Sequence, residues 1–321
     1  MRPAPRGRGS IGPAILFSYL VGGLALRLTI RDAVPGLAAW YYATPPLVLL
    51  ALATACACWS ARLRWWVPAL VCALLAWRIG TWCYDGQRVA RPQASRPQDV
   101  RVLCWNTQRK FISHPAVVRE LKAAGADVLA LSEAGRPQDA VAVGQQVARS
   151  FPGYASSALK GGLVVLVRGL VREARYERLG QGPFAAAKGW GGGLLVDVET
   201  RAGKLRLLVF DHASNPLVSR ASAFQRLDEW LASLHPPVDC VLGDFNTPSS
   251  SVHMHGLETS FQHAFGVAGQ GWINSWPWPL PLLDLDHIWV SRRWRVLRCR
   301  MGDFQASDHR YVLADLAARH D

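Results

Sequence analysis

The chain has 321 residues, of which 50% are hydrophobic and 18% are charged, and its formal net charge is +13 at pH 7. This length has room for one large domain and an appendage. Four of the seven cysteines lie in residues 1–84, and the other three lack metal-ligand spacing, which argues against a disulfide framework or a zinc site. Residues 1–97 carry a net charge of +9, and residues 98–321 carry only +4. The basic charge is therefore weak evidence for nucleic-acid binding and better evidence for membrane topology.

Residues 1–84 contain three apolar segments, at 11–30, 45–59 and 65–83, interrupted only by Arg27 and Arg78 among charged residues. About 20 apolar residues span the hydrocarbon core of a bilayer, and flanking aromatic residues extend the second and third segments. We therefore expect a membrane region with about three transmembrane helices. Two alternatives stay open for this region. The first segment resembles a signal peptide that lacks a clear cleavage site, and the segments also suit buried helices of a soluble domain.

Arginines outside the apolar segments predict the orientation of this region. They form three groups: Arg2, Arg6 and Arg8; Arg62 and Arg64; and Arg88, Arg91 and Arg96. The positive-inside rule places the first two groups in the cytoplasm. Three spans then place the C-terminal domain on the extracytoplasmic side of a multi-pass membrane protein, although the third group argues mildly for the opposite orientation.

Residues 85–99 are polar, contain two prolines and are predicted to be a linker. Apolar strands and amphipathic helices then alternate through residues 100–321, which we expect to form one catalytic domain. The predicted strands are 100–105, 127–131, 162–167, 194–199, 205–210, 238–242, 285–290, 295–300 and 311–316, and the predicted helices are 116–124, 140–149 and 217–234. Three cysteines fall within these strands and are expected to be small buried residues. This pattern alone indicates mixed α and β structure.

The stretch from Cys240 to Pro248 is the most informative one in the chain. An apolar strand runs into Gly243, which can adopt backbone angles that other residues resist. Asp244 and Asn246 follow two residues apart, and residues at this spacing on an extended backbone point to the same side. Both side chains are therefore expected to project into one site, where they suit orienting a water or holding a cation.

Similar polar residues occur at the ends of several other predicted strands. They are Asn106 after Trp105; Ser132 and Glu133; Asp211 and His212; Asp286 and His287 before Ile288; and Ser307, Asp308 and His309. Polar groups at the ends of many strands are how a sheet scaffold assembles a site. Together with the Gly-Asp-Phe-Asn stretch, these residues resemble the endonuclease/exonuclease/phosphatase superfamily, the deoxyribonuclease-I-like phosphoesterases, over residues 98–321. The resemblance implies a four-layer α/β sandwich of two packed, mainly antiparallel sheets flanked by helices.

The resemblance also assigns a role to each of these residues. It implies that Asn106, Glu133 and Asp308 lie at a metal ion, and oxygen ligands favour Mg²⁺ or Mn²⁺. Asp244 and Asn246 are expected to orient the attacking water and a phosphate oxygen.

Two histidines complete the catalytic set that the resemblance implies. His309 is expected to contact the scissile phosphate, with Asp286 fixing its tautomer and favouring its cation. His212 matches the second histidine of the family and is expected to be a phosphate contact or general acid. An acid, Asp211, precedes it, which departs from the family pattern.

The sequence thus predicts a membrane-anchored, divalent-metal-dependent phosphoesterase that hydrolyses phosphodiester bonds by in-line attack of water, in the manner of a nuclease. Its partners would be a phosphoester substrate, either nucleic acid or a lipid head group, and the bilayer. A phosphodiesterase or phosphatase acting on phospholipid or sphingolipid head groups is the alternative. A non-catalytic scaffold of the same fold is a third hypothesis. An aromatic and proline-rich stretch at 272–281 either stacks bases, dips into an interface or packs over the sheet edge.

Overall fold

The computed structural model describes residues 11–62, 66–85, 87–91, 93–94, 96, 98–179, 191–303 and 306–319. The chain divides into two compact units, Met1–Gly86 and Gln87–Asp321.

The first unit is helical. Its helices are α1 (Ile11–Leu28), α2 (Pro35–Ala43), α3 (Pro46–Arg62) and α4 (Trp66–Asp85), and α3 packs against both α1 and α4. Helices α1, α3 and α4 coincide with the three apolar segments, whereas α2 lies between the first two, where no separate helix was expected. Within the described residues, no single helix combines the length and apolar character needed to cross a membrane. Helices α2 and α3 meet that requirement only together, over Pro35–Ala43 and Pro46–Trp59, with a 68° bend between them.

Arg27, the charge that interrupts the first apolar segment, is buried within this unit. Its Nε and Nη2 donate to the carbonyl oxygens of Thr44 and Tyr41, at 2.5 and 2.9 Å. Its guanidinium also lies 4.3 Å from the centre of the Tyr41 ring. Because buried charge is tolerated only when it is paired or hydrogen-bonded, these contacts let an arginine remain on an otherwise apolar helix.

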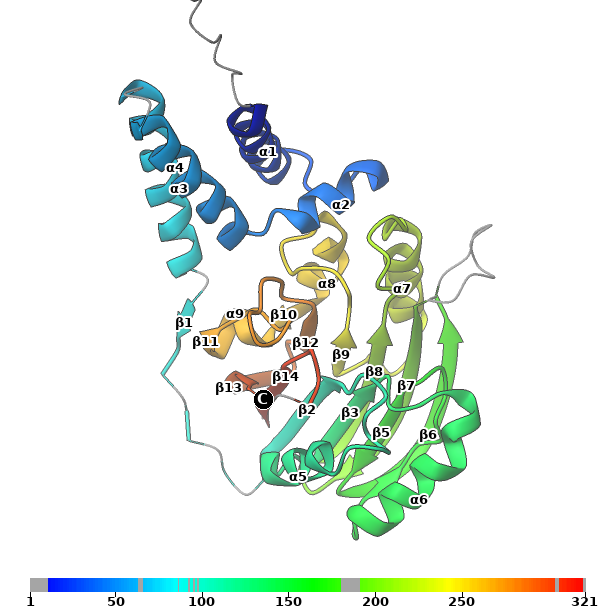
Figure 1. The fold of residues 1–321 in the computed structure, drawn as a ribbon. Helices are drawn as coiled ribbons and strands as arrows, with labels where there is room; N and C mark the ends of the chain where they lie inside the picture. The colour runs from blue at the N-terminus through cyan, green and yellow to red at the C-terminus, as the bar shows by residue number, and fades with distance from the viewer. Residues whose placement is uncertain are drawn as a thin grey trace, which may run out of the picture. The chain divides into compact units, whose positions relative to one another are not determined.

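The second unit contains two mixed β-sheets (Figure 1). The eight-stranded sheet has the order β1 (Gln87–Val89), β11 (Gly269–Trp272), β13 (Trp294–Gly302), β14 (Tyr311–Ala318), β2 (Val100–Asn106), β3 (Val128–Ser132), β5 (Val164–Val167), β4 (Ala155–Ser156). The six-stranded sheet has the order β10 (Phe261–His263), β12 (Asp286–Ser291), β9 (Cys240–Asp244), β8 (Gly203–Asp211), β7 (Gly192–Thr200), β6 (Gly169–Arg178). All nine predicted strands are present, and most neighbouring strands run antiparallel.

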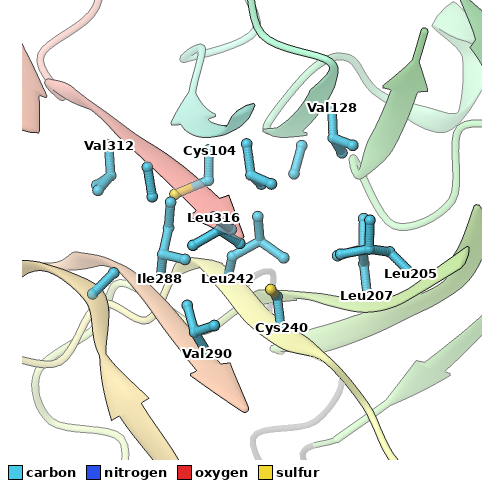
Figure 2. Packing of buried hydrophobic residues seen from close by; sticks show 14 of the residues in the cluster. Cys104, Val128, Leu205, Leu207, Cys240, Leu242, Ile288, Val290, Val312 and Leu316 are labelled. Carbon is cyan, nitrogen blue, oxygen red and sulfur yellow. The ribbon is translucent and has the colours of Figure 1, made fainter. Parts of the chain in front are cut away.

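Alternating apolar residues of the two sheets face each other and form the central core. Figure 2 shows Cys104, Val128 and Val312 of one sheet opposite Leu242 and Ile288 of the other. The three strand cysteines are fully buried free thiols, as expected for small core residues. This apolar contact between the sheets leaves the polar residues at the strand ends outside the core, where they can form a site.

Helices cover the outer faces of both sheets. Helices α5 (Pro115–Ala124) and α6 (Ala140–Ser150) pack on the eight-stranded sheet through residues such as Leu121 and Val147. Helix α7 (Ala221–Ser233) packs on the six-stranded sheet through Phe224, Leu227 and Trp230. The resulting order is helices, sheet, sheet, helix, as the resemblance implies. Shorter elements complete the unit: α8 (His255–Ser260), α9 (Ala264–Ala268) and the 3-10 helices η1 (Pro137–Asp139) and η2 (Val252–Met254).

Part of the predicted linker belongs to the second unit. Residues 87–89 form β1, which pairs antiparallel with β11. Beyond it, the backbone N–H of Gln93 donates to the carbonyl of Leu297 at 3.2 Å. Residues 86, 92, 95 and 97 of the same stretch lie outside the described residues. The sheet therefore extends into a segment that its polar composition alone indicated to be a tether.

Candidate active site

The ends of five strands bring the polar residues together. In the six-stranded sheet, Asp211 of β8 and Asp286 of β12 are both register partners of Asp244 on β9. In the eight-stranded sheet, Asn106 at the end of β2 is the register partner of Ser132, which directly precedes Glu133. Three carboxylates thus lie across adjacent strands of one sheet, and an amide and a carboxylate lie at the edge of the other.

The turn after β9 is shaped by Gly243 and Asn246. Gly243 has φ 136°, and a Cβ at this position would collide with the carbonyl oxygen of Phe210. The strand ends at Asp244, and Asn246 has φ 47°, a left-handed conformation that asparagine tolerates. The expectation that alternation carries Asp244 and Asn246 to the same side was therefore wrong in its reasoning, because the backbone is not extended beyond Asp244.

The Asn246 side chain fixes the turn instead of continuing the strand pattern. Its Nδ2 donates to the His212 carbonyl at 2.8 Å, and its backbone N–H donates to Asp244 Oδ1 at 2.9 Å. The Asn246 carbonyl in turn accepts from Arg220 Nη2 at 3.1 Å. These contacts hold the Asp244 carboxylate and the β8 end in register.

Asn106 links the two sheets at the site. Its Nδ2 donates to Asp244 Oδ2 at 2.8 Å and to Glu133 Oε1 at 3.3 Å. Its Oδ1 accepts from the Gln108 backbone N–H at 2.9 Å. One amide therefore holds the carboxylates of β9 and of the β3 end close together.

Glu133 adopts a strained backbone conformation, with φ 45°. Its carbonyl accepts hydrogen bonds from the Arg109 backbone N–H at 2.7 Å and from Thr107 Oγ1 at 3.0 Å. Its side chain is 36% exposed and lies 3.6 Å from Arg109 Nε. A left-handed glutamate that is held by its neighbours points to a functional constraint at this position.

Asp286 and His309 form a buried pair. His309 Nδ1 lies 2.7 Å from Asp286 Oδ2, and His309 Nε2 lies 3.8 Å from Asp244 Oδ2. Burial lowers the pKa of His309, but Asp286 and Asp244 outweigh this effect and raise it to about 10. Burial also raises the pKa of Asp244 to about 7, against the opposing effect of His309. The site thus contains an imidazolium that is held between two aspartates.

Asp308, the third residue that the resemblance places at the metal, lies beside this pair. It is half-buried, and its Oδ2 accepts a hydrogen bond from Trp276 Nε1 at 3.2 Å. The Asp308 charge contributes to the raised pKa of His309. The indole contact is a feature that the sequence pattern did not predict.

The position of His212 differs from the expectation. His212 is buried on the outer face of its sheet, where its ring lies 5.9 Å from Phe224 and its Nδ1 lies 3.1 Å from the Ala213 carbonyl. Burial, and then the Arg220 charge, lower its pKa to about 4. The histidine therefore packs under α7 as a neutral side chain, and its assignment as a phosphate contact or general acid does not fit this structure.

Asp211 takes the inward position that was expected for His212. Along β8, Leu205, Leu207 and Val209 belong to the core between the sheets, so alternation carries Asp211 to the same face. Burial, followed by the Asp244 and Glu133 carboxylates, raises the pKa of Asp211 well above its ordinary value. The sequence shows this acid as a departure from the family pattern. Alternation along β8 is the signal that could have placed it in the site.

Buried His212 makes the stability of the protein depend on pH. The unfolded histidine has a pKa of about 6.5 and the folded one about 4, so only the unfolded state gains a proton between these values. We expect about 3 kcal/mol of stability to be lost as pH falls from 7 to 4. Over this pH range the free energy of unfolding of His212→Leu, measured in urea, should fall by about 3 kcal/mol less than that of wild type. Exposed His114→Leu serves as the control, and an equal loss in His212→Leu would contradict the assignment.

The donor set fits a divalent cation that prefers oxygen. Asp244, Asp286 and His309 are a group among the described residues whose ligand atoms lie within 4.8 Å of one another. Asp286 Oδ1 is buried without a hydrogen-bond partner. Glu133 and Asp211 add two further carboxylates near this group. These carboxylate oxygens, with the Asn106 amide beside them, suit Mg²⁺ or Mn²⁺ better than a softer ion.

A two-sheet sandwich with carboxylates, an amide and an aspartate–histidine pair at its strand ends defines the class of deoxyribonuclease-I-like phosphoesterase folds. Residues 103–309 match the model of the Endonuclease/Exonuclease/phosphatase family. The chain therefore belongs to this family, whose members are typically hydrolases of phosphoester bonds. No curated protein sequence matches the chain.

Solved structures show the same fold at low sequence identity. An endonuclease/exonuclease/phosphatase from Bacteroides vulgatus is 15% identical with a TM-score of 0.53, covering 69% of this chain and 99% of the other. D. rerio TDP2 complexed with single strand DNA product is 14% identical with a TM-score of 0.53, covering 68% and 99%. The human Nocturnin catalytic domain with bound sulfate anion is 16% identical with a TM-score of 0.53, covering 71% and 100%. These likenesses concern the fold alone.

Proposed function

We propose that this protein is a divalent-metal-dependent phosphodiesterase of the nuclease kind, which cleaves its substrate by in-line attack of water. The observation that carries the proposal is the buried Asp286–His309 pair with His309 Nε2 3.8 Å from Asp244 Oδ2. An acceptor for a proton from water and a donor for a phosphate oxygen are thereby adjacent. This is the arrangement that acid–base catalysis at phosphorus requires.

Asp244 activates the water in this scheme. Burial raises the pKa of this carboxyl, which makes its carboxylate a stronger base. The hydrogen bonds from Asn106 Nδ2 and from the Asn246 backbone fix the carboxylate. As the water oxygen bonds to phosphorus, Asp244 takes the proton of the water and the bond from phosphorus to the leaving oxygen breaks.

His309 stabilises the charge that develops on the phosphoryl oxygens. Because Asp286 accepts from Nδ1, the Nε2–H faces Asp244 and the reacting group. The raised pKa keeps the ring cationic at neutral pH. A preorganised cation in a water-poor site is worth much more to the transition state than the same charge in water. No covalent intermediate on the protein is required.

Glu133, together with Asn106 and Asp308 as the resemblance implies, would hold the cation beside the carboxylates of Asp244 and Asp286, and Asp211 lies near Glu133. The cation would neutralise negative charge on the phosphate and on this acidic cluster. The protein residues hold the position for it through the Asn106 hydrogen bonds and the fixed Glu133 backbone. This arrangement of residues does not depend on a particular metal.

Nucleic acid is the substrate class that we favour. The single-strand DNA product in the similar D. rerio TDP2 structure supports it at the level of the fold. A lipid head-group phosphodiester or phosphomonoester is the second candidate, favoured by the apolar helices of the first unit. The site residues are polar or charged at every assigned position, which speaks against a non-catalytic scaffold.

The salt dependence of cleavage distinguishes the two substrate classes. The full chain in detergent is incubated with Mn²⁺ and either single-stranded DNA or vesicles containing phosphatidylglycerol and sphingomyelin, at 50 and 200 mM salt. For DNA we expect cleavage that falls steeply with salt, because binding to phosphates releases counterions. Cleavage of lipid alone, with little dependence on salt, would replace the nuclease proposal by the head-group one.

We also propose that residues 1–84 attach the protein to a bilayer, with the catalytic unit on the extracytoplasmic side. The apolar helices and the distribution of arginines before them support this arrangement. A C-terminal fusion to alkaline phosphatase, which is active only outside the cytoplasm, tests it in bacterial cells. Phosphatase activity in an alkaline-extracted membrane fraction is expected. An inactive fusion in that fraction would reverse the orientation, and recovery in the soluble fraction would contradict membrane attachment.

A further inference from the structure

The aromatic stretch before β12 contacts the Asp308 segment directly. Trp276 Nε1 donates to Asp308 Oδ2 at 3.2 Å, and the Trp278 backbone N–H donates to the Asp308 carbonyl at 2.8 Å. Asp308 is thus held at its side chain and at its backbone by residues two positions apart. Nothing in the sequence pattern of either segment predicts this pairing.

The Trp276 backbone is itself fixed. Trp276 and Leu283 form an antiparallel bridge in which each backbone N–H donates to the carbonyl of the other, at 2.9 and 2.8 Å. Next to it, Ser275 Oγ accepts from the backbone N–H groups of Leu285 and Asp286, both at 3.1 Å. The indole is therefore anchored to the strand that supplies the aspartate of the Asp286–His309 pair.

Arg310 holds the same two segments together from the other side. This buried residue donates through its backbone N–H to the Ser275 carbonyl at 2.9 Å and through Nη1 to the carbonyls of Asn274 and Trp272, at 2.8 and 3.0 Å. Its guanidinium also lies 5.8 Å from the Trp278 ring. Residues 308–310 and 272–278 are thus hydrogen-bonded to each other at several points, and the Trp276 indole reaches a carboxylate of the site.

We propose that Trp276 is a positioning residue for Asp308, fixing its carboxylate by the indole N–H so that it can serve a divalent cation. The inference rests on the proposed metal-dependent function. Asp308 is half-buried, and without a donor its side chain would rotate between rotamers. The indole N–H fixes Oδ2 of this carboxylate. Partners that orient a ligand in this way typically change metal affinity 10- to 100-fold when removed.

Trp276→Phe removes the donor and keeps an aromatic ring, and Trp272→Phe is the matched control. Trp272 Nε1 donates to the Pro281 carbonyl at 3.1 Å in the same stretch and does not contact a site carboxylate. Binding of Mn²⁺ to the full chain is measured from the loss of the free-Mn²⁺ electron paramagnetic resonance signal. We expect the Kd to rise about 10-fold in Trp276→Phe and to stay within about twofold of wild type in Trp272→Phe.

A double-substitution cycle with Asp308→Asn shows whether Trp276 acts through Asp308. We expect Trp276→Phe to weaken Mn²⁺ binding no further in the Asp308→Asn background, because coupled residues are not additive. An unchanged Kd in Trp276→Phe, or full additivity in the double variant, overturns the positioning role while wild-type hydrolysis leaves the proposed function standing. A wild-type protein that neither binds Mn²⁺ nor hydrolyses a phosphodiester overturns both.

Discussion

Replacing Asp244 by asparagine should lower kcat for phosphodiester hydrolysis by about 10³-fold, the range expected for loss of a positioned general base. The substitution keeps the shape of the side chain and an oxygen that can accept the Asn106 hydrogen bond, but it removes the proton acceptor. Asp244 is buried beside Asp286, and both effects raise its pKa to about 7. An ionised Asp244 therefore costs folding free energy at and above neutral pH, so the thermal midpoint of Asp244→Asn in chelator should equal or exceed that of wild type.

Asp239→Asn is the matched control for this substitution. Asp239 is also buried and directly precedes β9, but it lies at the opposite end of the strand, where it accepts from Trp294 Nε1 at 2.8 Å and from Arg293 Nη2 at 2.9 Å. We expect Asp239→Asn to lower stability and to leave kcat within a few-fold of wild type. Hydrolysis by Asp244→Asn at the wild-type rate would remove Asp244 from the mechanism.

Replacing Asp286 by asparagine should lower kcat by about 10²- to 10³-fold and change the pH profile. Asp286 is, after the opposing effect of burial, the main cause of the raised pKa of His309. Without that carboxylate the pKa of His309 falls, so the ring loses its proton at a lower pH than in wild type. The alkaline limb of the kcat profile should therefore move to lower pH, as measured by initial rates at saturating substrate.

Asp284→Asn controls for a change of charge close to β12. Asp284 is buried two residues before Asp286, and its Oδ2 accepts from the Ser249 backbone N–H at 3.0 Å. We expect the alkaline limb of the Asp284→Asn kcat profile to coincide with that of wild type. A profile that is unchanged in Asp286→Asn would show that His309 does not act as the cation of the mechanism.

The positions of the strands, and with them the ends where the site forms, could be predicted from sequence. Continuous apolar runs marked the central strands because both faces of those strands are buried. The edge strand β6 (Gly169–Arg178) was missed because it is largely exposed and rich in charged residues, a composition that edge strands share with loops. Helix α2 was not predicted for a different reason: aromatic residues beside an apolar segment also suit a membrane interface.

The direction of each site side chain was harder to predict. Asp211 ends β8 and His212 directly follows it, so a choice of face for one fixes the other, and the family pattern favoured the histidine. The face follows instead from Leu205, Leu207 and Val209, which belong to the core between the sheets. Beyond Asp244 the strand rule failed because Asn246 is left-handed, which a sequence read as extended does not reveal.

Long-range contacts could not be predicted from local pattern at all. The Asn106 amide meets Asp244 across 138 residues, and the Trp276 indole meets Asp308 across 32. Each contact depends on how the sheets stack and on how the stretch before β12 is braced. These are properties of the assembled fold, and they decide which oxygen atoms remain for a cation.

Hydrolysis of bis-p-nitrophenyl phosphate by the full chain tests the central claim most directly. The rate is measured with Mg²⁺ or Mn²⁺, then with excess EDTA, and again for His309→Ala. We expect turnover with the metal, none above background with EDTA, restoration when metal is added back, and a loss of about 10²-fold or more in His309→Ala. Turnover that persists in EDTA, or that is unchanged in His309→Ala, would contradict a metal-dependent phosphodiesterase centred on these residues.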